Sequence, residues 1–137
     1  MNDVIRVGIA DMNTCMAGDT ITTIGLGSCV GIVLYERTKN IAGLVHIMLP
    51  DSTKIRQNQN KLKFADTGIQ ALVEELEKQG LELTDGDEIV FCQKNEATGD
   101  IDKYEVSIKN RGDRLPVEIL QNILDDYLSQ NESADID

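Results

Sequence analysis

The amino-acid sequence predicts an α+β fold, with a mixed, mostly antiparallel β core and helices on the outside. Three observations support this prediction. The first half of the chain holds several short runs rich in Val and Ile. Two later segments repeat apolar residues at three- and four-residue steps. The connections between strand-like runs are short. The 137 residues are enough for one domain with its own hydrophobic core.

The first half of the chain is expected to form strands. Four apolar runs are bounded by Gly, Asn or Pro, namely Val4–Ile9, Ile21–Ile24, Cys29–Tyr35 and Ile41–Met48. The third and fourth runs are almost continuously apolar, so we expect both faces of these strands to be buried. The polar segment Glu36–Asn40 between them suits a hairpin connection. After Pro50, the polar segment Asp51–Lys63 is expected to form a mobile surface loop.

The second half is expected to add helices and two further strands. The apolar residues of Leu62–Lys78 fall on one side of a helix, and Gly80 stands where a C-terminal cap belongs. A second amphipathic stripe covers residues 116–128, with Pro116 in the first turn, where proline is tolerated. Two strand-like segments and the turn between them complete the prediction: Glu88–Cys92, Lys103–Lys109 and Asn95–Gly99.

The net charge of −11 is concentrated in the second half. Residues 1–68 carry seven Lys and Arg against six Asp and Glu, whereas residues 69–137 carry six against eighteen. Phosphate backbones bind basic surfaces, so a nucleic-acid partner is not expected. The acidic half is most simply a well-solvated face, and residues 129–137 are expected to form an acidic tail.

Cysteine usage and apolar runs bear on the class of protein. The three cysteines, Cys15, Cys29 and Cys92, contain no C-x-x-C pair, so neither a disulfide framework nor a zinc ribbon is indicated. The opening MNDVIRVGIADMN has two early acids and no long apolar run, unlike a signal peptide. No stretch approaches the roughly 18 apolar residues of a membrane span. We therefore expect a reduced, cytoplasmic protein without membrane insertion.

The segment Thr23-Ile-Gly-Leu-Gly-Ser-Cys-Val30 carries the clearest chemical signal. Two glycines just before Cys29 let the backbone turn sharply and approach another group closely. A cysteine nucleophile needs this geometry, with backbone N–H groups near its sulfur to hold a developing oxyanion. The competing interpretation is that Cys29 is a small buried core residue in a tight turn.

The only histidine, His46, lies in the middle of an apolar run. A buried imidazole is costly without a partner, and a neighbouring thiol would supply one. His46 would then act as general base and hold the sulfur as thiolate. Thr23 could orient the imidazole through its hydroxyl, as the third member of a triad. Alternatively, His46 is a satisfied core residue and Thr23 an ordinary strand threonine.

These motifs together resemble the CheD family of chemoreceptor glutamine deamidases. The string T-x-G-L-G-S-C-V is followed, seventeen residues after the Cys, by the His of V-H-I-M-L-P-D-S. The opening VGIADMN and the segment K-F-A-D-T-G-I-Q-A-L are also similar to that family, so the resemblance covers about residues 4–79. It implies a CheD-like fold in the first half, with Cys29 as nucleophile, His46 as base and Thr23 as the group that orients the His.

The resemblance also implies a reaction and its partners. The thiolate would attack the side-chain amide of a glutamine on a cytoplasmic chemoreceptor helix, release ammonia, and leave a thioester that water hydrolyses to glutamate. Gly25, Gly27 and Ser28 are the candidates for substrate and oxyanion contacts. No metal or organic cofactor is implied. A CheC-type phosphatase is a second implied partner.

After about residue 80 the chain departs from the family pattern. The Gly-Gly-Ala and Met-Phe segment that continues CheD proteins is absent, and the sequence contains no Gly-Gly pair. The chain could be a shortened single domain, a domain that lost its substrate groove, or a CheD-like half joined near Gly80 to a foreign module. Two other functional classes are therefore weighed against the enzyme: a non-catalytic module that docks on a chemotaxis partner, and, with least support, a metal site formed by the cysteines and His46.

Overall fold

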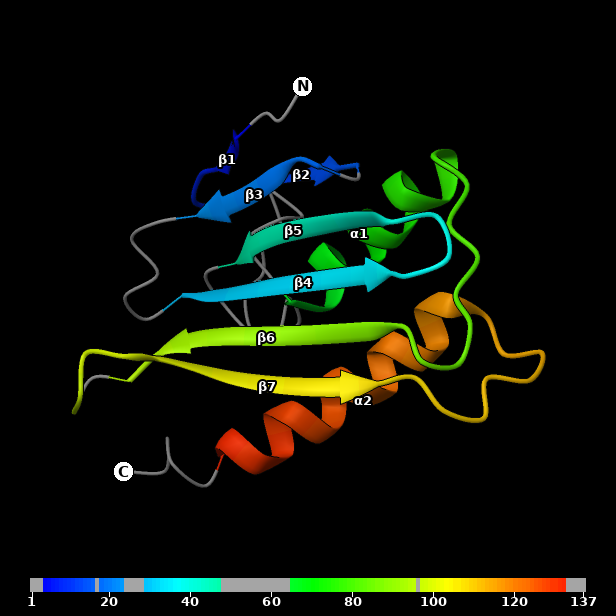
Figure 1. The fold of residues 1–137 in the computed structure, drawn as a ribbon. Helices are drawn as coiled ribbons and strands as arrows, with labels where there is room; N and C mark the ends of the chain where they lie inside the picture. Colours follow the sequence, from blue (N-terminus) through cyan, green and yellow to red (C-terminus); the bar gives the residue numbers. More distant parts are fainter. Residues whose placement is uncertain (1–3, 17, 24–28, 48–64, 96, 133–137) are drawn as a thin grey trace.

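The computed structural model describes residues 4–16, 18–23, 29–47, 65–95 and 97–132, and they form two sheets and two helices (Figure 1). The larger sheet has five antiparallel strands in the order β2-β5-β4-β6-β7, and a small parallel sheet pairs β1 with β3. The bounds are β1 Val4–Val7, β2 Asp11–Cys15, β3 Thr20–Thr23, β4 Val30–Glu36, β5 Ile41–Ile47, β6 Glu88–Lys94 and β7 Ile101–Ser107. The predicted α+β class with a mixed, mostly antiparallel core is confirmed.

Both helices lie on the same face of the five-stranded sheet (Figure 1). Helix α1 (Ala65–Lys78) packs on β5, where a Cβ at Gly43 would stand 2.6 Å from a Leu72 methyl carbon. Helix α2 (Pro116–Glu132) packs on β6, where the ring of Tyr127 stacks on Phe91 at a centroid distance of 4.4 Å. We call this the helix-covered face of the sheet, and the other the open face.

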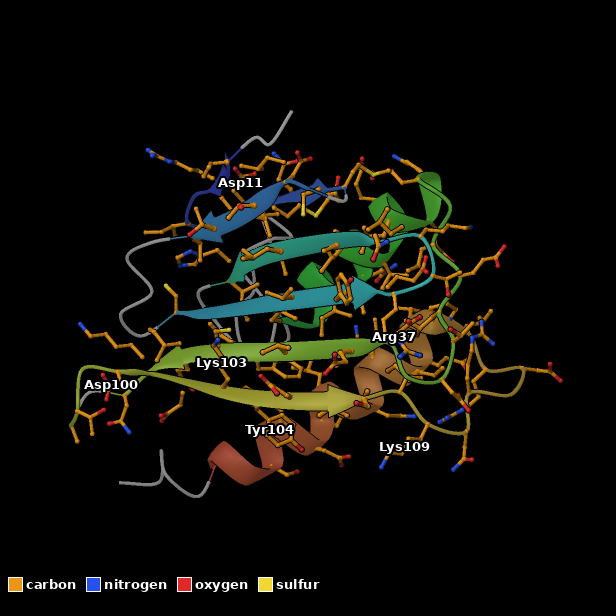
Figure 2. The ribbon with its side chains drawn as sticks, in the orientation of Figure 1. Asp11, Arg37, Asp100, Lys103, Tyr104 and Lys109 are labelled. Atoms are coloured by element: carbon orange, nitrogen blue, oxygen red, sulfur yellow. The ribbon has the colours of Figure 1, made fainter. Side chains whose placement is uncertain are left out.

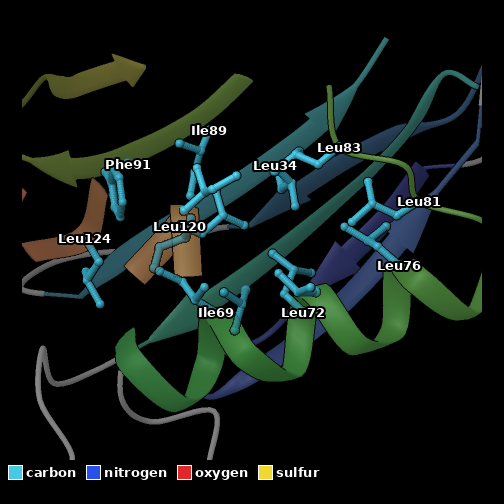
Figure 3. Packing of buried hydrophobic residues seen from close by; sticks show 14 of the residues in the cluster. Leu34, Ile69, Leu72, Leu76, Leu81, Leu83, Ile89, Phe91, Leu120 and Leu124 are labelled. Atoms are coloured by element: carbon cyan, nitrogen blue, oxygen red, sulfur yellow. The ribbon is translucent and has the colours of Figure 1, made fainter. Parts of the chain in front are cut away.

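The hydrophobic core fills the space between the helices and this face (Figure 3). The cluster joins residues from both halves of the chain, including Leu34, Leu72, Phe91 and Leu120. Strand β6 also pairs directly with β4, in the middle of the sheet. The sheet and the core are therefore continuous across Gly80, the point at which a foreign module was expected to join in one of the three alternatives.

Burial of the two central strands differs in part from expectation. Every residue of β5 is buried, as predicted. The expectation that β4 is buried on both faces is wrong at its C-terminal end, where Tyr35 is 38% exposed. The reason is that the small sheet covers the open face only over β2 and β5, as the contact between Thr23 of β3 and His46 of β5 shows. Nothing equivalent among the described residues covers β4, β6 and β7 on that side.

The predicted end of α1 and the predicted start of α2 at Pro116 agree with the structure, whereas the predicted end of α2 at residue 128 is wrong. At the end of α1, Gly80 has φ of +98°, its N–H bonds to the Glu77 carbonyl, and the Leu81 N–H bonds to the Leu76 carbonyl. These two bonds form a Schellman cap, as expected for this glycine. The predicted helix start at Leu62 and the predicted loop 51–63 lie outside the described residues. Helix α2 continues to Glu132, into the segment for which an acidic tail is predicted.

One strand was not predicted. Strand β2, with the sequence Asp-Met-Asn-Thr-Cys, has a polar composition because it is an edge strand with only part of its surface in the core. Asp and Asn are depleted in strands, so propensity alone does not indicate it. Its pairing with β5 supplies the hydrogen bonds that the sequence pattern cannot show. The other predicted strands are present, with ends shifted by a few residues. Among the described residues, no helix combines the length and apolarity that a membrane crossing requires.

Candidate active site

His46 lies on the open face of β5, beneath the small sheet. Its neighbours in the register are Asp11 on β2 and Gly31 on β4. Side chains alternate along a strand, so Val45 and Ile47 point to the helix-covered face and His46 to the opposite one. The side chains of Val45 and Ile47 lie close to Gly68 of α1, which confirms that these two residues face the helices. The imidazole is fully buried.

The hydroxyl of Thr23 joins His46 to the backbone of β1. Its Oγ1 lies 2.6 Å from the carbonyl oxygen of Val7 and 2.7 Å from Nδ1 of His46. A threonine hydroxyl has one proton, and a carbonyl oxygen can only accept. Thr23 must therefore donate to Val7 and accept from the imidazole. The pair of bonds selects the neutral tautomer with the proton on Nδ1 and the lone pair on Nε2.

The second ring nitrogen, unlike Nδ1, has no hydrogen bond within the described part of the chain. Nε2 of His46 is buried and has no hydrogen-bond partner among the described residues. Burial also lowers the pKa of His46, because the charged imidazolium would lose its hydration. The result is a neutral imidazole, held at one nitrogen, whose other nitrogen keeps a free lone pair. That is the form required of a general base.

Cys29 immediately precedes β4, and strand alternation places its position on the open face, with Gly31 and His46. It is a free cysteine, 9% exposed. The structure thus brings Thr23 and His46 into direct contact and sets Cys29 at the end of the adjacent strand. The thiol is not hydrogen-bonded to Nε2. The predicted oxyanion and substrate residues, Gly25, Gly27 and Ser28, lie outside the described residues.

The other two cysteines have less reactive surroundings. Burial raises the pKa of the Cys15 thiol, and the nearby Asp19 carboxylate raises it further. Burial also raises the pKa of Cys92, assisted by Glu105 and opposed by the positive charge of Lys103. Both groups are therefore held as thiols rather than thiolates. In the described parts of the chain, no group of three or more His, Cys, Asp or Glu side chains has the arrangement of a metal site.

Two features of the site have no sequence signal. The Val7 acceptor is a backbone carbonyl, which every residue possesses, so only the pairing of β1 with β3 reveals it. The second feature is a row of register neighbours that crosses all five strands on the open face. It runs Asp11, His46, Gly31, Cys92, Lys103, and Figure 2 labels its two ends. Strand alternation in β6 and β7 could have suggested the last two members, but not their alignment with His46.

Comparisons with known proteins indicate the family to which this chain is related. The family described as "CheD chemotactic sensory transduction" matches residues 48–87. A relative from Lachnoclostridium phytofermentans is 63% identical over 76 residues, which is 56% of this chain and 47% of the relative. One from Caldanaerobacter subterraneus subsp. tengcongensis is 61% identical over 77 residues, 56% of this chain and 48% of the relative. Both carry the name "Probable chemoreceptor glutamine deamidase CheD".

A third relative extends the similarity into the second half. The protein of the same name from Clostridium botulinum (strain Eklund 17B / Type B) is 38% identical over 132 residues, covering 91% of this chain and 80% of that relative. The matches to the first two relatives span about half of the length of each. The longer match extends beyond Gly80, and this chain belongs to the CheD family.

Proposed function

We propose that this chain is a cysteine-dependent protein-glutamine deamidase that acts on chemoreceptors. The observation that carries the proposal is the hydrogen-bond chain from Val7 through Thr23 to His46, which leaves a neutral imidazole with a free Nε2 lone pair. Cys29 stands at the end of the neighbouring strand. The names of the relatives supply the substrate, a chemoreceptor glutamine.

The reaction follows from these groups in two halves. Nε2 of His46 takes the proton of the Cys29 thiol, and the thiolate attacks the side-chain amide carbon of the glutamine. The tetrahedral adduct collapses as the amide nitrogen takes a proton from His46, so that ammonia leaves and a thioester remains. Water then attacks the thioester carbon and gives a proton to His46. Glutamate is released, and the cysteine recovers its proton.

Each described residue has a distinct role in this scheme. Cys29 forms the covalent bond, His46 moves the proton, and Thr23 is a positioning residue that acts through the ring. The thiol and Nε2 tighten into a hydrogen bond when substrate binds, as catalytic pairs of free enzymes commonly do. Backbone N–H groups of residues 27–29 are the predicted oxyanion donors. The scheme needs no cofactor, because every proton and bond is supplied by the chain, the substrate and water.

The direct test is ammonia release from cytoplasmic fragments of chemoreceptors. The wild-type chain should convert specific glutamines to glutamate, as mass spectrometry of the fragments would show, and Cys29→Ala should not. Cys15→Ala is the matched control, since it removes another buried thiol outside the proposed site. If the wild type releases no more ammonia than Cys29→Ala, the deamidase proposal is wrong. Binding of the fragments, or of a CheC-type phosphatase, without turnover would then support the docking-module alternative.

A thiol titration tests the base without a substrate. We expect Cys29 to be alkylated by iodoacetamide at lower pH than Cys15 and Cys92, whose pKa values are raised by burial. His46→Gln should remove this difference because Gln cannot accept the thiol proton. Equal reactivity of the three cysteines in the wild type would contradict the proposed role of His46.

A further inference from the structure

The open face beyond the small sheet is exposed and carries a defined pattern of charge. His46 aligns in the register with Gly31, Cys92 and Lys103, so that β4, β6 and β7 extend sideways from the site. Since Gly31 has no side chain, the row has a gap between the buried imidazole and Cys92. Lys94 adds a second cation, because it follows Gln93, the register partner of Val30. It therefore stands across from the Cys29 end of β4.

These two lysines are unusual in their surroundings. Residues 69–137 carry six basic against eighteen acidic side chains, yet Lys94 and Lys103 both lie at the end of the open face next to Cys29. Both side chains are exposed, and neither forms a salt bridge with any described residue. Lys103 is the register partner of Cys92, so the two side chains are neighbours on the open face.

The acidic side chains of β6, β7 and their connection occupy other positions relative to Cys29. Glu88 pairs in the register with Tyr35, and Glu105 with Val90, so both lie farther from Cys29 along the strands. Asp102 belongs to the helix-covered face by strand alternation and accepts a hydrogen bond from Asn95. Asp100 lies in the hairpin loop beyond the strands. The charged positions of β6 and β7 that face the open side nearest Cys29 are therefore Lys94 and Lys103, and Asp100 lies one residue beyond Ile101, the register partner of Lys94.

We propose that Lys94 and Lys103 bind carboxylates that flank the target glutamine on a helical substrate. This inference rests on the proposed deamidase function and specifies the substrate class, an acidic helix. The small sheet covers the open face over β2 and β5, on the far side of His46 from β4. Among the described residues, the part of the open face that the small sheet leaves uncovered lies over β4, β6 and β7, so a substrate helix that presents its glutamine to Cys29 is expected to extend over β6 and β7.

The strand spacing sets the positions of the acidic residues. Neighbouring strands lie about 4.8 Å apart, so Lys94 on β6 is one spacing from β4 and Lys103 on β7 is two, roughly 10 Å. A helix rises about 5.4 Å per turn. Lys103 is also displaced by two residues along β7, because the register partner of Lys94 is Ile101. A helix that crosses the strands obliquely with its glutamine at Cys29 would place a residue one turn away over Lys94 and a residue two turns away within reach of Lys103. The preferred substrate has acidic residues at both of these positions on the same side of the glutamine.

Two helical peptides that differ only at these positions test the proposal. The first carries Glu one and two turns from the glutamine, and the second carries Ala at both. In Lys94→Gln/Lys103→Gln, the KM for the acidic peptide should rise about two- to ten-fold at unchanged kcat, and the KM for the Ala peptide should not change. Lys109→Gln is the matched control, because Lys109 is an equally exposed lysine at the opposite end of β7 (Figure 2). High salt should remove the preference for the acidic peptide.

A binding measurement separates this inference from the deamidase proposal. Cys29→Ala, with and without the two lysine substitutions, is titrated against each fluorescently labelled peptide and followed by anisotropy. Tighter binding of the acidic peptide that disappears with the lysines supports the inference even if no ammonia is ever released. Equal binding of both peptides, or equal weakening by Lys109→Gln, overturns it even if the wild type is an active deamidase.

Discussion

The two faces of the five-stranded sheet are made from alternate residues of the same strands, yet their chemistry differs. On the helix-covered face, Ile32, Leu34 and Val45 are fully buried among apolar side chains of both helices. On the open face, β5 carries His46, β4 carries Gly31, which has no side chain, and β6 carries the half-buried Cys92. Alternate residues of one strand therefore belong either to the hydrophobic core or to the candidate site, so the two are not encoded in separate segments of the chain. This alternation also makes the two faces separable by mutation.

The largest effect is expected from the open face. His46→Gln removes the only imidazole while keeping a polar side chain of similar reach. Loss of a general base lowers turnover by about 10²–10⁴-fold, so ammonia release from receptor fragments should fall in that range. Cooperative unfolding in urea should persist because the core lies on the other face. Wild-type turnover in this variant would remove His46 from the mechanism.

The next effect belongs to the helix-covered face. Leu120 of α2 is 1% exposed in the core, and Leu120→Ala should lower the free energy of unfolding by about 2–5 kcal/mol. Urea unfolding monitored by circular dichroism measures this change. The kcat of the protein that remains folded should be close to that of the wild type. A loss of kcat without a loss of stability would show that the two faces are not separable.

A smaller effect should follow from the hydroxyl that bridges the two sheets. Thr23→Val leaves the Nδ1 proton and the Val7 carbonyl unpaired and frees the ring tautomer, which should lower kcat about ten-fold. Thr23→Ser restores the hydroxyl and should recover most of the rate. Because the chain has one histidine, ¹⁵N spectra report its tautomer without assignment. The wild type should show a protonated Nδ1 and an unprotonated Nε2, and the reverse pattern would contradict the proposed hydrogen-bond directions.

The smallest effect concerns stability against pH. Burial lowers the pKa of His46 in the folded state, so the unfolded chain binds a proton more readily. The free energy of unfolding should therefore decrease as the pH falls below the unfolded value of about 6.5, until the folded pKa is reached. Urea midpoints measured across that interval should show this slope in the wild type and not in His46→Gln. An identical slope in both proteins would assign it to other groups.

The fold could be predicted from the sequence wherever composition and periodicity agree. The apolar runs around β4 and β5, the stripe of α1 and the cap at Gly80 all have local signals, and the structure confirms them. Strand β2 could not be predicted, because a polar edge strand owes its conformation to its partner. For the same reason, the exposure of Tyr35 depends on where the small sheet ends, which no local pattern encodes.

The candidate site was predictable in its residue types and not in its geometry. Cys29, His46 and Thr23 are visible as a motif. The predicted contact between Thr23 and His46 is present, whereas the predicted hydrogen-bond contact between the Cys29 thiol and the imidazole is not. The direction of that hydrogen bond depends on a backbone carbonyl of β1, and the alignment of Lys103 with His46 depends on three strand pairings. The hydrogen-bond direction and the strand alignment both depend on tertiary contacts between residues that are distant in the sequence.

The hairpin that joins β4 to β5 has a consequence for the chemistry at the opposite end of these strands. It is closed by Asn40 at φ of +53°, by a bond from the Lys39 N–H to the Glu36 carboxylate, and by a bond from the Tyr35 hydroxyl to Asn40. A slip of one residue in this hairpin would turn His46 into the apolar core and Val45 to the open face. A strand-pairing error during folding would therefore remove the imidazole from the candidate site, so the turn at residues 37–40 determines the geometry of that site from the opposite end of the sheet.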